Sequence, residues 1–418
     1  MRQWMVAAKK ADFYAIAEKF HVDPVVARII RNREVIGEKN IRIYLGGNLS
    51  DLSDPHQMKD MDRLVEILAQ KIRKQVHIRI IGDYDVDGVT SSHLFLTALR
   101  RVGAKVDVVI PHRIQDGYGL SLHLLQQAKE DGVDTILTCD NGIAAIDEIA
   151  WAKAQKMTVL VTDHHAVPFE EHEGRRTEKK SLADAVVNPH QQDCRYPYKE
   201  LCGAGVAWNV IRVLYENYDM DKREAEDLLD FVAMATVCDV MSLTGENRIL
   251  VKEGLKRIRH TKNIGLQALM QACNVQPENI SAYHFGYVLG PCVNATGRLD
   301  TARHALRLFE TGQETEAEEI ARDLVDLNQE RKELTLQGVE MAKKLCEEGG
   351  YENDPVLVLF LPDVHESIAG LIAGRIREMY NRPVFVLTRG EEGVKGSGRS
   401  TENYSMYENM CCLLYTSP

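Results

Sequence analysis

The sequence has no long apolar segment. Nowhere does it approach the roughly 18 consecutive apolar residues that a membrane-spanning helix requires. Its first residues, MRQWMVAAKKADFY, also lack the apolar core of a secretory signal peptide. We therefore expect a protein that is neither inserted into a membrane nor exported.

The sequence also has no cysteine pattern typical of disulfide frameworks or zinc sites. Its nine cysteines are odd in number and dispersed, and no two have C-x-x-C spacing. Small extracellular domains depend on paired cysteines, whereas cytosolic proteins keep their thiols reduced. The pattern predicts reduced thiols and a cytoplasmic location.

An excess of basic residues is absent too. The chain carries 51 Lys and Arg against 62 Asp and Glu, a formal net charge of −11. This balance argues against a protein that coats nucleic acid with its whole surface, although it permits a local basic groove. The surplus carboxylates are available to hold metal. With 418 residues, 44% of them hydrophobic, the chain should form a multidomain globular protein.

Short β-rich segments alternate with helix-like segments between residues 77 and 162. We expect strands at HIRII (77–81), KVDVVI (105–110), TILTC (135–139) and TVLVT (158–162). Helix-like segments at 90–102, 121–130 and 143–156 separate them. Such alternation predicts βαβ crossovers and a doubly wound, mostly parallel sheet, which is an α/β fold.

The rest of the chain suggests further domains. We expect an N-terminal helical extension packed on the main lobe, a main α/β domain, a connector helix and a second, smaller α/β domain, at 1–75, 76–310, 311–350 and 351–418. The connector would be a rod of roughly 50 Å. The second domain looks unfinished, because only about 30 residues follow its second strand. The final MCCLLYTSP lacks periodicity, so we expect a truncated or non-native terminus.

Acidic residues follow three of the four expected strands. GDYDVDG comes after the first, CDNG after the third and TDHH after the fourth. Ligands of open parallel sheets bind at the carboxyl ends of the strands, so these loops should meet. Carboxylates brought together repel one another unless a cation neutralises them. The sequence therefore predicts a divalent metal site at this edge.

Each motif also has a simpler interpretation. DYDVDG resembles a calcium loop, but no glutamate stands at the required twelfth position. Asp140, followed by Asn141 and Gly142, could form only a turn, and Asp163 could only cap a helix. The occurrence of ligand-type residues after three strands favours the metal site over these separate explanations.

The three motifs, in this order, resemble the first three motifs of the DHH phosphoesterases. From about Leu45 onward, the chain more specifically resembles the RecJ family of bacterial single-strand-specific exonucleases. The further motifs that carry this resemblance are PHQMKDMDR, IPHRIQDGYGL, VVNPHQQDC, CGAGVAW, ATVCDVMSL, GPCVNATGRLDTA, LNQERKE, HESIAGLIAGRI and GSGRS.

The resemblance implies a two-metal active site in the main domain, which would be the DHH catalytic domain. The metal ligands it implies are Asp83, Asp85, Asp87, Asp140, His164 and Asp239. Asp140 would bridge the ions, and His165 would face the scissile phosphate. Asp87, Asp140 and His164 thus count as catalytic together with His165. Asp239 follows a helical run, and only the resemblance distinguishes it from an ordinary helix-terminal acid. Carboxylates with one imidazole suit Mn²⁺, with Mg²⁺ as a plausible substitute, and the ligand types alone also admit zinc.

The resemblance also implies substrate contacts, partly in the second, DHH-associated domain. Residues that would grip the backbone and the terminal 5′-phosphate are Arg113, Arg298, Ser397 and Arg399, and His365 would be a further substrate-binding residue that faces the cleft. Guanidinium groups suit phosphate oxygens because they bind them bidentately. The chain departs from the family at Val364, where tryptophan is usual, and it lacks a GGH-type motif and an OB-fold region before Pro418.

These features predict a metal-dependent 5′ to 3′ exonuclease that hydrolyses single-stranded DNA to mononucleotides in recombination and repair. Its partners would be DNA with a 5′ end, a helicase and a single-strand-binding protein, and it would be a monomer. One alternative is a DHH phosphodiesterase for short oligonucleotides or cyclic dinucleotides, which would not need the N-terminal helices or the long connector. Another is a non-catalytic replication scaffold similar to Cdc45-type relatives, which lose metal ligands that are all present here. The preference for DNA over RNA stays open.

Overall fold

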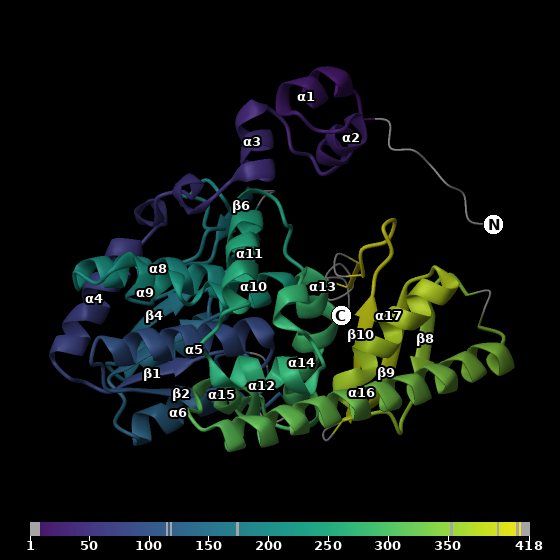
Figure 1. The fold of residues 1–418 in the computed structure, drawn as a ribbon. Coiled ribbons are helices and arrows are strands. Elements are labelled where there is room, and N and C mark those ends of the chain that lie inside the picture. Colours follow the sequence, from purple (N-terminus) through teal and green to yellow (C-terminus); the bar gives the residue numbers. More distant parts are fainter. Residues whose placement is uncertain are drawn as a thin grey trace. The chain divides into compact units, whose positions relative to one another are not determined.

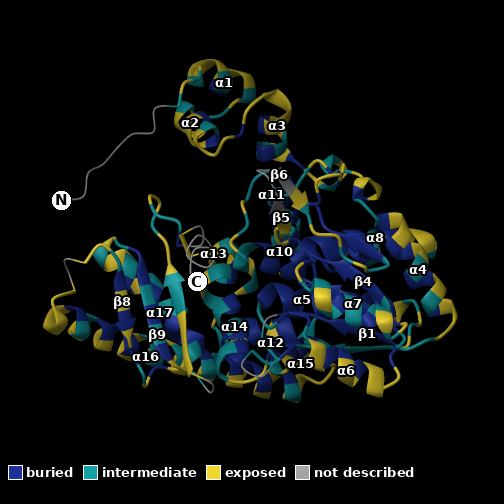
Figure 2. Ribbon diagram, turned by 180° about the vertical axis from the view of Figure 1, so that it is seen from behind, coloured by how far each residue is buried: buried dark blue, intermediate teal, exposed yellow. Residues whose placement is uncertain are grey.

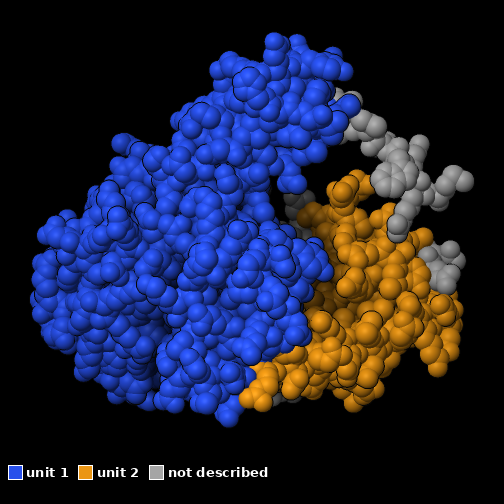
Figure 3. All heavy atoms as spheres, in the orientation of Figure 1, with its two compact units in different colours: residues 1–293, 302–321 blue, residues 294–301, 322–418 orange. Residues whose placement is uncertain are grey.

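The computed structural model describes residues 9–410, apart from 114, 115, 118, 173, 174, 352, 353, 391, 392, 407 and 408. The terminal segment 411–418, with the expected non-native terminus, lies outside the described residues. The chain forms two compact units (Figure 3). Unit 1 comprises Met1–Val293 and Ala302–Ala321, and unit 2 comprises Asn294–Thr301 and Arg322–Pro418. The domain limits expected from the sequence stay a prediction.

A five-stranded parallel sheet forms the centre of unit 1 (Figure 1). Its order is β2-β1-β3-β4-β7, and every neighbouring pair is parallel. The strands are β1 (Ile78–Ile81), β2 (Val106–Val109), β3 (Thr135–Cys139), β4 (Thr158–Thr162) and β7 (Ala185–Val187). The predicted α/β fold with a mostly parallel sheet is confirmed. Because β1 lies between β2 and β3, the chain reverses direction across the sheet there, and ligands of such folds bind at that switch point.

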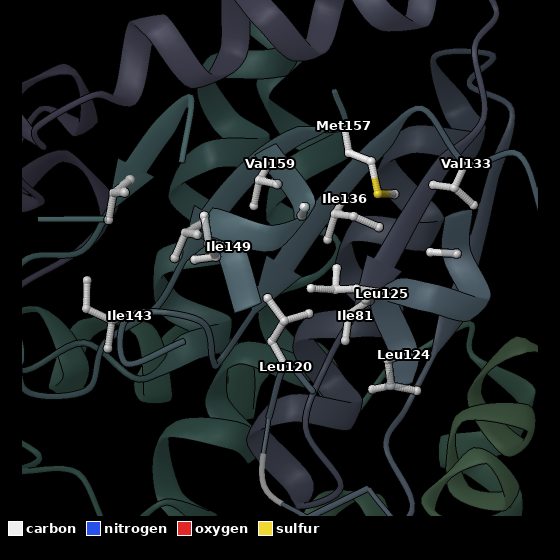
Figure 4. Packing of buried hydrophobic residues seen from close by; sticks show 14 residues of the cluster. Ile81, Leu120, Leu124, Leu125, Val133, Ile136, Ile143, Ile149, Met157 and Val159 are labelled. Carbon is white, nitrogen blue, oxygen red and sulfur yellow. The ribbon is translucent and has the colours of Figure 1, made fainter. Parts of the chain in front are cut away.

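Helices cover both faces of the sheet. On one face, apolar residues of α6 (Leu122–Glu130) and α7 (Ile146–Ala154) pack on Ile136 of β3 and Val159 of β4 (Figure 4). On the other face, α5 (Val86–Arg101) contacts β1, β2 and β3, and thirteen of its residues are buried. Strands β1, β3, β4 and β7 and helix α5 are accordingly among the most buried parts of unit 1 (Figure 2).

Helix α5 begins earlier than its apolar pattern indicates. The sequence predicts a helix from residue 90, but the structure starts it at Val86, inside the acidic motif. The side chain of Asp85 caps the helix, because its Oδ1 accepts a hydrogen bond from the Gly88 amide at 3.0 Å. The motif therefore forms both a loop and the first helical turn.

The N-terminal region forms small helices, α1 (Phe13–Phe20), α2 (Pro24–Asn32) and α3 (Glu38–Gly46). Further elements of unit 1 are η1 (Leu49–Asp51), η2 (Pro55–Gln57), α4 (Met61–Arg73), the hairpin β5 (Phe169–His172) and β6 (Arg175–Glu178), α8 (Gly203–Asn217), α9 (Lys222–Glu226), α10 (Leu229–Cys238), α11 (Gly245–Ile258), α12 (Ile264–Ala272), η3 (Pro277–Asn279), α13 (Ala282–His284), the π-helix η4 (Phe285–Leu289) and α15 (Ala302–Glu310). Helix α14 (Gly290–Leu299) contains residues of both units.

Unit 2 is a smaller α/β unit. Its sheet has the order β10-β9-β8, with β8 (Leu357–Phe360) parallel to β9 (Val384–Gly390) and β10 (Gly393–Arg399) antiparallel to β9. The other elements are α16 (Glu314–Gly349), which begins in unit 1, η6 (Glu366–Ile368) and α17 (Ala369–Tyr380). A Cβ atom at Gly338 of α16 would lie 2.3 Å from Ile372 Cδ1, so this internal glycine permits close packing of α16 on α17.

Among the described residues, no helix combines the length and the apolar character that crossing a bilayer demands.

His93 of α5 is a buried histidine in the core of unit 1. Its ring lies 4.4 Å from the Phe231 ring and 5.8 Å from the Phe309 ring, between centroids. Burial, followed by the charges of Arg100 and Arg101, lowers the pKa of His93 from 6.5 to about 3. The imidazole is therefore neutral in the folded protein at physiological pH.

The low pKa of His93 should make the protein sensitive to acid. Between pH 6.5 and about 3 the unfolded chain binds a proton at this position that the folded chain does not. Stability therefore falls as the pH decreases through this window. In urea denaturation, wild type should lose about 1.6 kcal/mol more than His93→Leu between pH 6.5 and pH 5. The exposed-site control His21→Asn should match wild type, and equal losses for wild type and His93→Leu would contradict the prediction.

Candidate metal centre

The acidic loops after β1, β3 and β4 converge at the carboxyl edge of the sheet. Asp83 follows β1 and is fully buried, and a Cβ atom at Gly88 would lie 2.4 Å from the carbonyl oxygen of Asp83. Glycine at this position thus lets the first turn of α5 pack directly against the end of β1. This close packing places Asp85 and Asp87 beside Asp83 within one motif.

Helix α8 closes the site from the other side. The amides of Gly203 and Ala204 donate to Asp87 Oδ2 and Oδ1 at 2.5 and 2.7 Å. A Cβ atom at Gly203 would lie 2.6 Å from the Cβ of Asp140, so only glycine permits this approach. The start of α8 therefore supplies partial positive charge to a cluster of carboxylates. This contact explains physically why CGAGVAW belongs to the site.

Asp140 and His164 occupy the middle of the cluster. Nε2 of His164 lies 3.0 Å from Asp140 Oδ1, 3.6 Å from Asp87 Oδ2 and 3.7 Å from Asp239 Oδ2. Asp140 adopts a left-handed backbone conformation with φ of 62°. Burial and the charges of the neighbouring carboxylates raise the pKa of Asp140 well above its ordinary value. The structure thus brings together acids from three separate stretches of chain.

Asp239 reaches the cluster from the end of α10, not from a strand. It caps the carboxyl end of that helix, which packs against α5 and α8. Burial, followed by the charges of Asp87 and Asp85, raises its pKa to about 8. The next residue, Val240, has φ of 58° and ends the helix in a conformation that β-branched residues rarely adopt. A tight helix end thus places this carboxylate opposite His164.

The side chains form three overlapping groups, and within each group the potential ligand atoms all lie within 4.8 Å of one another. They are Asp83, Asp85 and Asp140; Asp87, His164 and Asp239; and Asp140, His164 and His165. Neither carboxylate oxygen of the buried Asp83 has a hydrogen-bond partner among the described residues. Burial and the charge of Asp85 raise the pKa of Asp83 to about 8. A carboxylate that accepts no hydrogen bond and lies near other carboxylates and an imidazole is a suitable ligand for a hard divalent cation such as Mn²⁺ or Mg²⁺.

Asp163 has a different role from its neighbours. Its Oδ1 accepts hydrogen bonds from the amides of His164 and His165 and from Nδ1 of His165, and its Oδ2 accepts one from the Ile143 amide. Burial alone would raise the pKa of Asp163, but these hydrogen bonds hold it below its ordinary value. The same contact with Asp163 raises the pKa of His165 to about 9. The sequence placed Asp163 among the strand-end acids of the expected metal site, with a helix cap as the simpler alternative, and neither interpretation indicated this positioning role.

The expected substrate-binding residues lie in both units. Arg113 belongs to unit 1, where its guanidinium lies 4.8 Å from the ring centroid of Tyr84, within the acidic motif. The other four belong to unit 2 and gather at the start of α17: Arg298 donates to the Ser367 carbonyl at 2.6 Å, His365 contacts Ser367 Oγ at 2.6 Å, and Arg399 lies 3.3 Å from Ser397 Oγ. A Cβ atom at Gly370 would approach both Arg399 and Ser397 closely.

Comparisons with known proteins agree with this geometry. Residues 77–236 match the model of the DHH family, N-terminal domain. The chain is 36% identical to the single-stranded-DNA-specific exonuclease RecJ of Haemophilus influenzae over 92% of this chain and 67% of that protein. It is 33% identical to the RecJ of Bacillus subtilis over 95% of this chain but only 49% of that protein. The chain therefore spans about half of one of these relatives and about two thirds of the other.

Solved structures show the same similarity. A crystal structure of exonuclease RecJ bound to manganese matches with a TM-score of 0.72 and 32% identity, covering 85% of each chain. RecJ from Thermus thermophilus in complex with Mn²⁺ matches with a TM-score of 0.78 and 29% identity, covering 96% of this chain and 55% of that one. The relatives thus bind manganese on the fold described above.

The cluster should bind Mn²⁺ with an affinity that depends on Asp140. Because Asp140 belongs to two of the ligand groups, Asp140→Asn removes charge from both. In calorimetric titrations of the metal-free protein, we expect this variant to bind Mn²⁺ at least about tenfold more weakly than wild type, or about 1.4 kcal/mol. Asp326→Asn, the same change at an exposed position of α16, should bind as wild type does. Equal affinities for all three proteins would rule out the proposed ligand set.

Proposed function

Because the chain belongs to the RecJ family of single-stranded-DNA-specific exonucleases, we propose that it hydrolyses single-stranded DNA from a 5′ end with the help of two divalent metal ions. The observation that carries this proposal is the set of overlapping ligand groups, in which the buried Asp83 lacks hydrogen-bond donors among the described residues. Buried carboxylates without partners are costly in a folded protein, so the arrangement favours bound cations.

The side chains divide into two sets of ligands that share Asp140. Asp83 and Asp85 with Asp140 would hold one ion, and Asp87, His164 and Asp239 would hold the other. Asp140 would join the second set as well, because its Oδ1 lies 3.0 Å from His164 Nε2. Two such ions, when bound, supply charge stabilisation at the phosphate and activate water as a nucleophile.

His165 would act on the substrate directly. The hydrogen bond to Asp163 raises the pKa of His165 and holds the Nδ1 side of the ring, which leaves Nε2 for a contact with the substrate. The imidazole of His165 can therefore donate a hydrogen bond to a phosphate oxygen whose negative charge increases during the reaction. Asp163 is a positioning residue here, since its oxygens are occupied by hydrogen bonds within the loop.

We assign recognition of the terminal 5′-phosphate to unit 2. Arg298, His365, Ser397 and Arg399 gather there around one helix start, where guanidinium and hydroxyl groups suit phosphate oxygens. Arg113 of unit 1 would hold the DNA backbone beside the acidic motif. Release of mononucleotides is proposed from the family resemblance.

Several finer points belong to the same proposal. Mn²⁺ would be preferred to Mg²⁺, the protein would act as a cytoplasmic monomer in recombination and repair, and a helicase and a single-strand-binding protein would supply or share the substrate. The ligand chemistry supports the preference for Mn²⁺, and the dispersed cysteines support the cytoplasmic location. The family supports the biological role and the partners. The complete ligand set argues against a non-catalytic scaffold.

The proposal predicts which substrates are hydrolysed. Purified protein with Mn²⁺ should release mononucleotides from 5′-phosphorylated single strands, should leave blunt duplexes intact, and should degrade strands labelled at the 5′ end first at the label. Asp140→Ala should lower the rate by on the order of 100- to 1,000-fold. The exposed-site variant Asp326→Asn serves as the control for folding and charge. Hydrolysis of dinucleotides alone would instead support the small-substrate phosphodiesterase, and no hydrolysis of any substrate by wild type would contradict an enzymatic role for this chain.

A further inference from the structure

The surface of unit 1 carries a pair of exposed aromatic rings. Tyr283 of α13 is 63% exposed, and Tyr287 of η4 is 72% exposed. Their rings stack on each other, with centroids 5.2 Å apart and planes inclined by 24°. Single apolar side chains are common on protein surfaces, whereas exposed apolar groups that gather in one place mark a binding site.

The pair also has a simpler interpretation. Because they are four residues apart, the tyrosines can support the short helical segment through their contact with each other. That role requires only the two ring faces that meet. Phe285, midway between them in the sequence, is fully buried and anchors the segment in the core. The tyrosines therefore project from the solvent side of the segment, with their outer faces open to a ligand.

The segment that carries the tyrosines packs against α10, the helix that ends at the metal centre (Figure 1). The thiol of Cys238, the last residue of α10, donates a hydrogen bond to the Phe285 carbonyl at 3.3 Å, and the proposed metal ligand Asp239 follows directly. A Cβ atom at Gly290 would clash with Cys238 Sγ, so the two segments are in close contact. One helix diameter, about 10–12 Å, therefore separates the outer side of the tyrosine segment from the end of α10.

Exposed apolar surface also lies directly beside the proposed metal ligand. Val240 follows Asp239, is 87% exposed and has φ of 58°. A β-branched residue rarely adopts this conformation, and backbone strain of this kind is concentrated at ligand-binding sites. Apolar side chains are thus open to solvent at the metal centre and on the segment packed against it. A polymeric substrate that extends from the metal centre over this segment would contact both.

We propose that Tyr283 and Tyr287 form a stacking platform for the bases of a single strand of DNA whose phosphate is bound at the metal centre. Every base presents a flat π-face, and stacking on aromatic side chains holds a strand without reading its sequence. In a duplex both faces of a base pair are covered by its neighbours, so the platform accepts only an unpaired strand. This inference rests on the proposed function, because it takes single-stranded DNA as the substrate, and it gives that strand a second contact outside the metal centre.

Binding of strands with and without bases tests the platform. The probes are a normal 5′-phosphorylated DNA strand of about 12 nucleotides and a strand of equal length made of abasic residues, both labelled with fluorescein at the 3′ end. Fluorescence anisotropy is measured with the full chain in EDTA, where metal-dependent hydrolysis does not proceed. We expect the double variant Tyr283→Ala/Tyr287→Ala to bind the normal strand at least about tenfold more weakly than wild type, or about 1.4 kcal/mol. Both proteins should bind the abasic strand equally.

Matched variants separate stacking from folding. Tyr283→Phe/Tyr287→Phe keeps both rings and should bind the normal strand as wild type does. Tyr14→Ala removes a ring that is 79% exposed on α1 and should also leave binding unchanged. Equal binding of the normal strand by wild type and the alanine double variant would overturn the platform. An equal loss for the normal and abasic strands would also overturn it, because the rings would then support the fold or contact the DNA backbone.

Hydrolysis distinguishes this inference from the proposed function. With Mn²⁺, the alanine double variant should have a KM for the normal strand at least about tenfold above that of wild type, with kcat unchanged. Tyrosine-dependent binding by a protein that hydrolyses no substrate would support the platform and contradict the proposed nuclease. A wild-type dimer that the alanine double variant loses would assign the rings to a contact between copies of the chain, and would overturn the platform.

Discussion

Electrostatic repulsion among buried carboxylates is the constraint on which this structure depends. Asp83, Asp87 and Asp140 are each at most 2% exposed, and they lie with Asp85 and Asp239 around one histidine. Burial and mutual charge raise the pKa values of Asp83 and Asp239 to about 8. Such a cluster is unfavourable unless protons or cations neutralise it, and divalent ions neutralise it without removing its ability to bind phosphate.

Much of the local structure around the site holds these groups in place. Parallel strands bring the acidic loops to one edge, and glycines at 88 and 203 let α5 and α8 approach the carboxylates closely. Amides at the start of α8 stabilise Asp87, while Asp163 accepts three hydrogen bonds from His164 and His165 and one from the Ile143 amide. The positions that tolerate least change are therefore small or polar residues around the site, as well as the apolar core.

Periodicity and strand-end position predicted the sheet and most of the acidic cluster. They failed where the structure depends on features that apolar periodicity does not record, such as a helix cap, a very short strand or an acid at a helix end. The start of α5 was placed too late because Asp85 serves as a cap, and the three-residue β7 and the β5–β6 hairpin were not predicted at all. Asp239 lies at the end of a helix, so its position after a strand could not mark it as a metal ligand. Only the resemblance to the family indicated that role.

The central claim is that these carboxylates hold two metal ions. Anomalous diffraction from crystals of this chain grown with Mn²⁺ tests it most directly, because manganese positions can be located independently of the protein atoms. The account predicts two strong peaks, one contacted by Asp83 and Asp85, one by Asp87, His164 and Asp239, and both by Asp140. A single peak, or peaks away from Asp140, would contradict it.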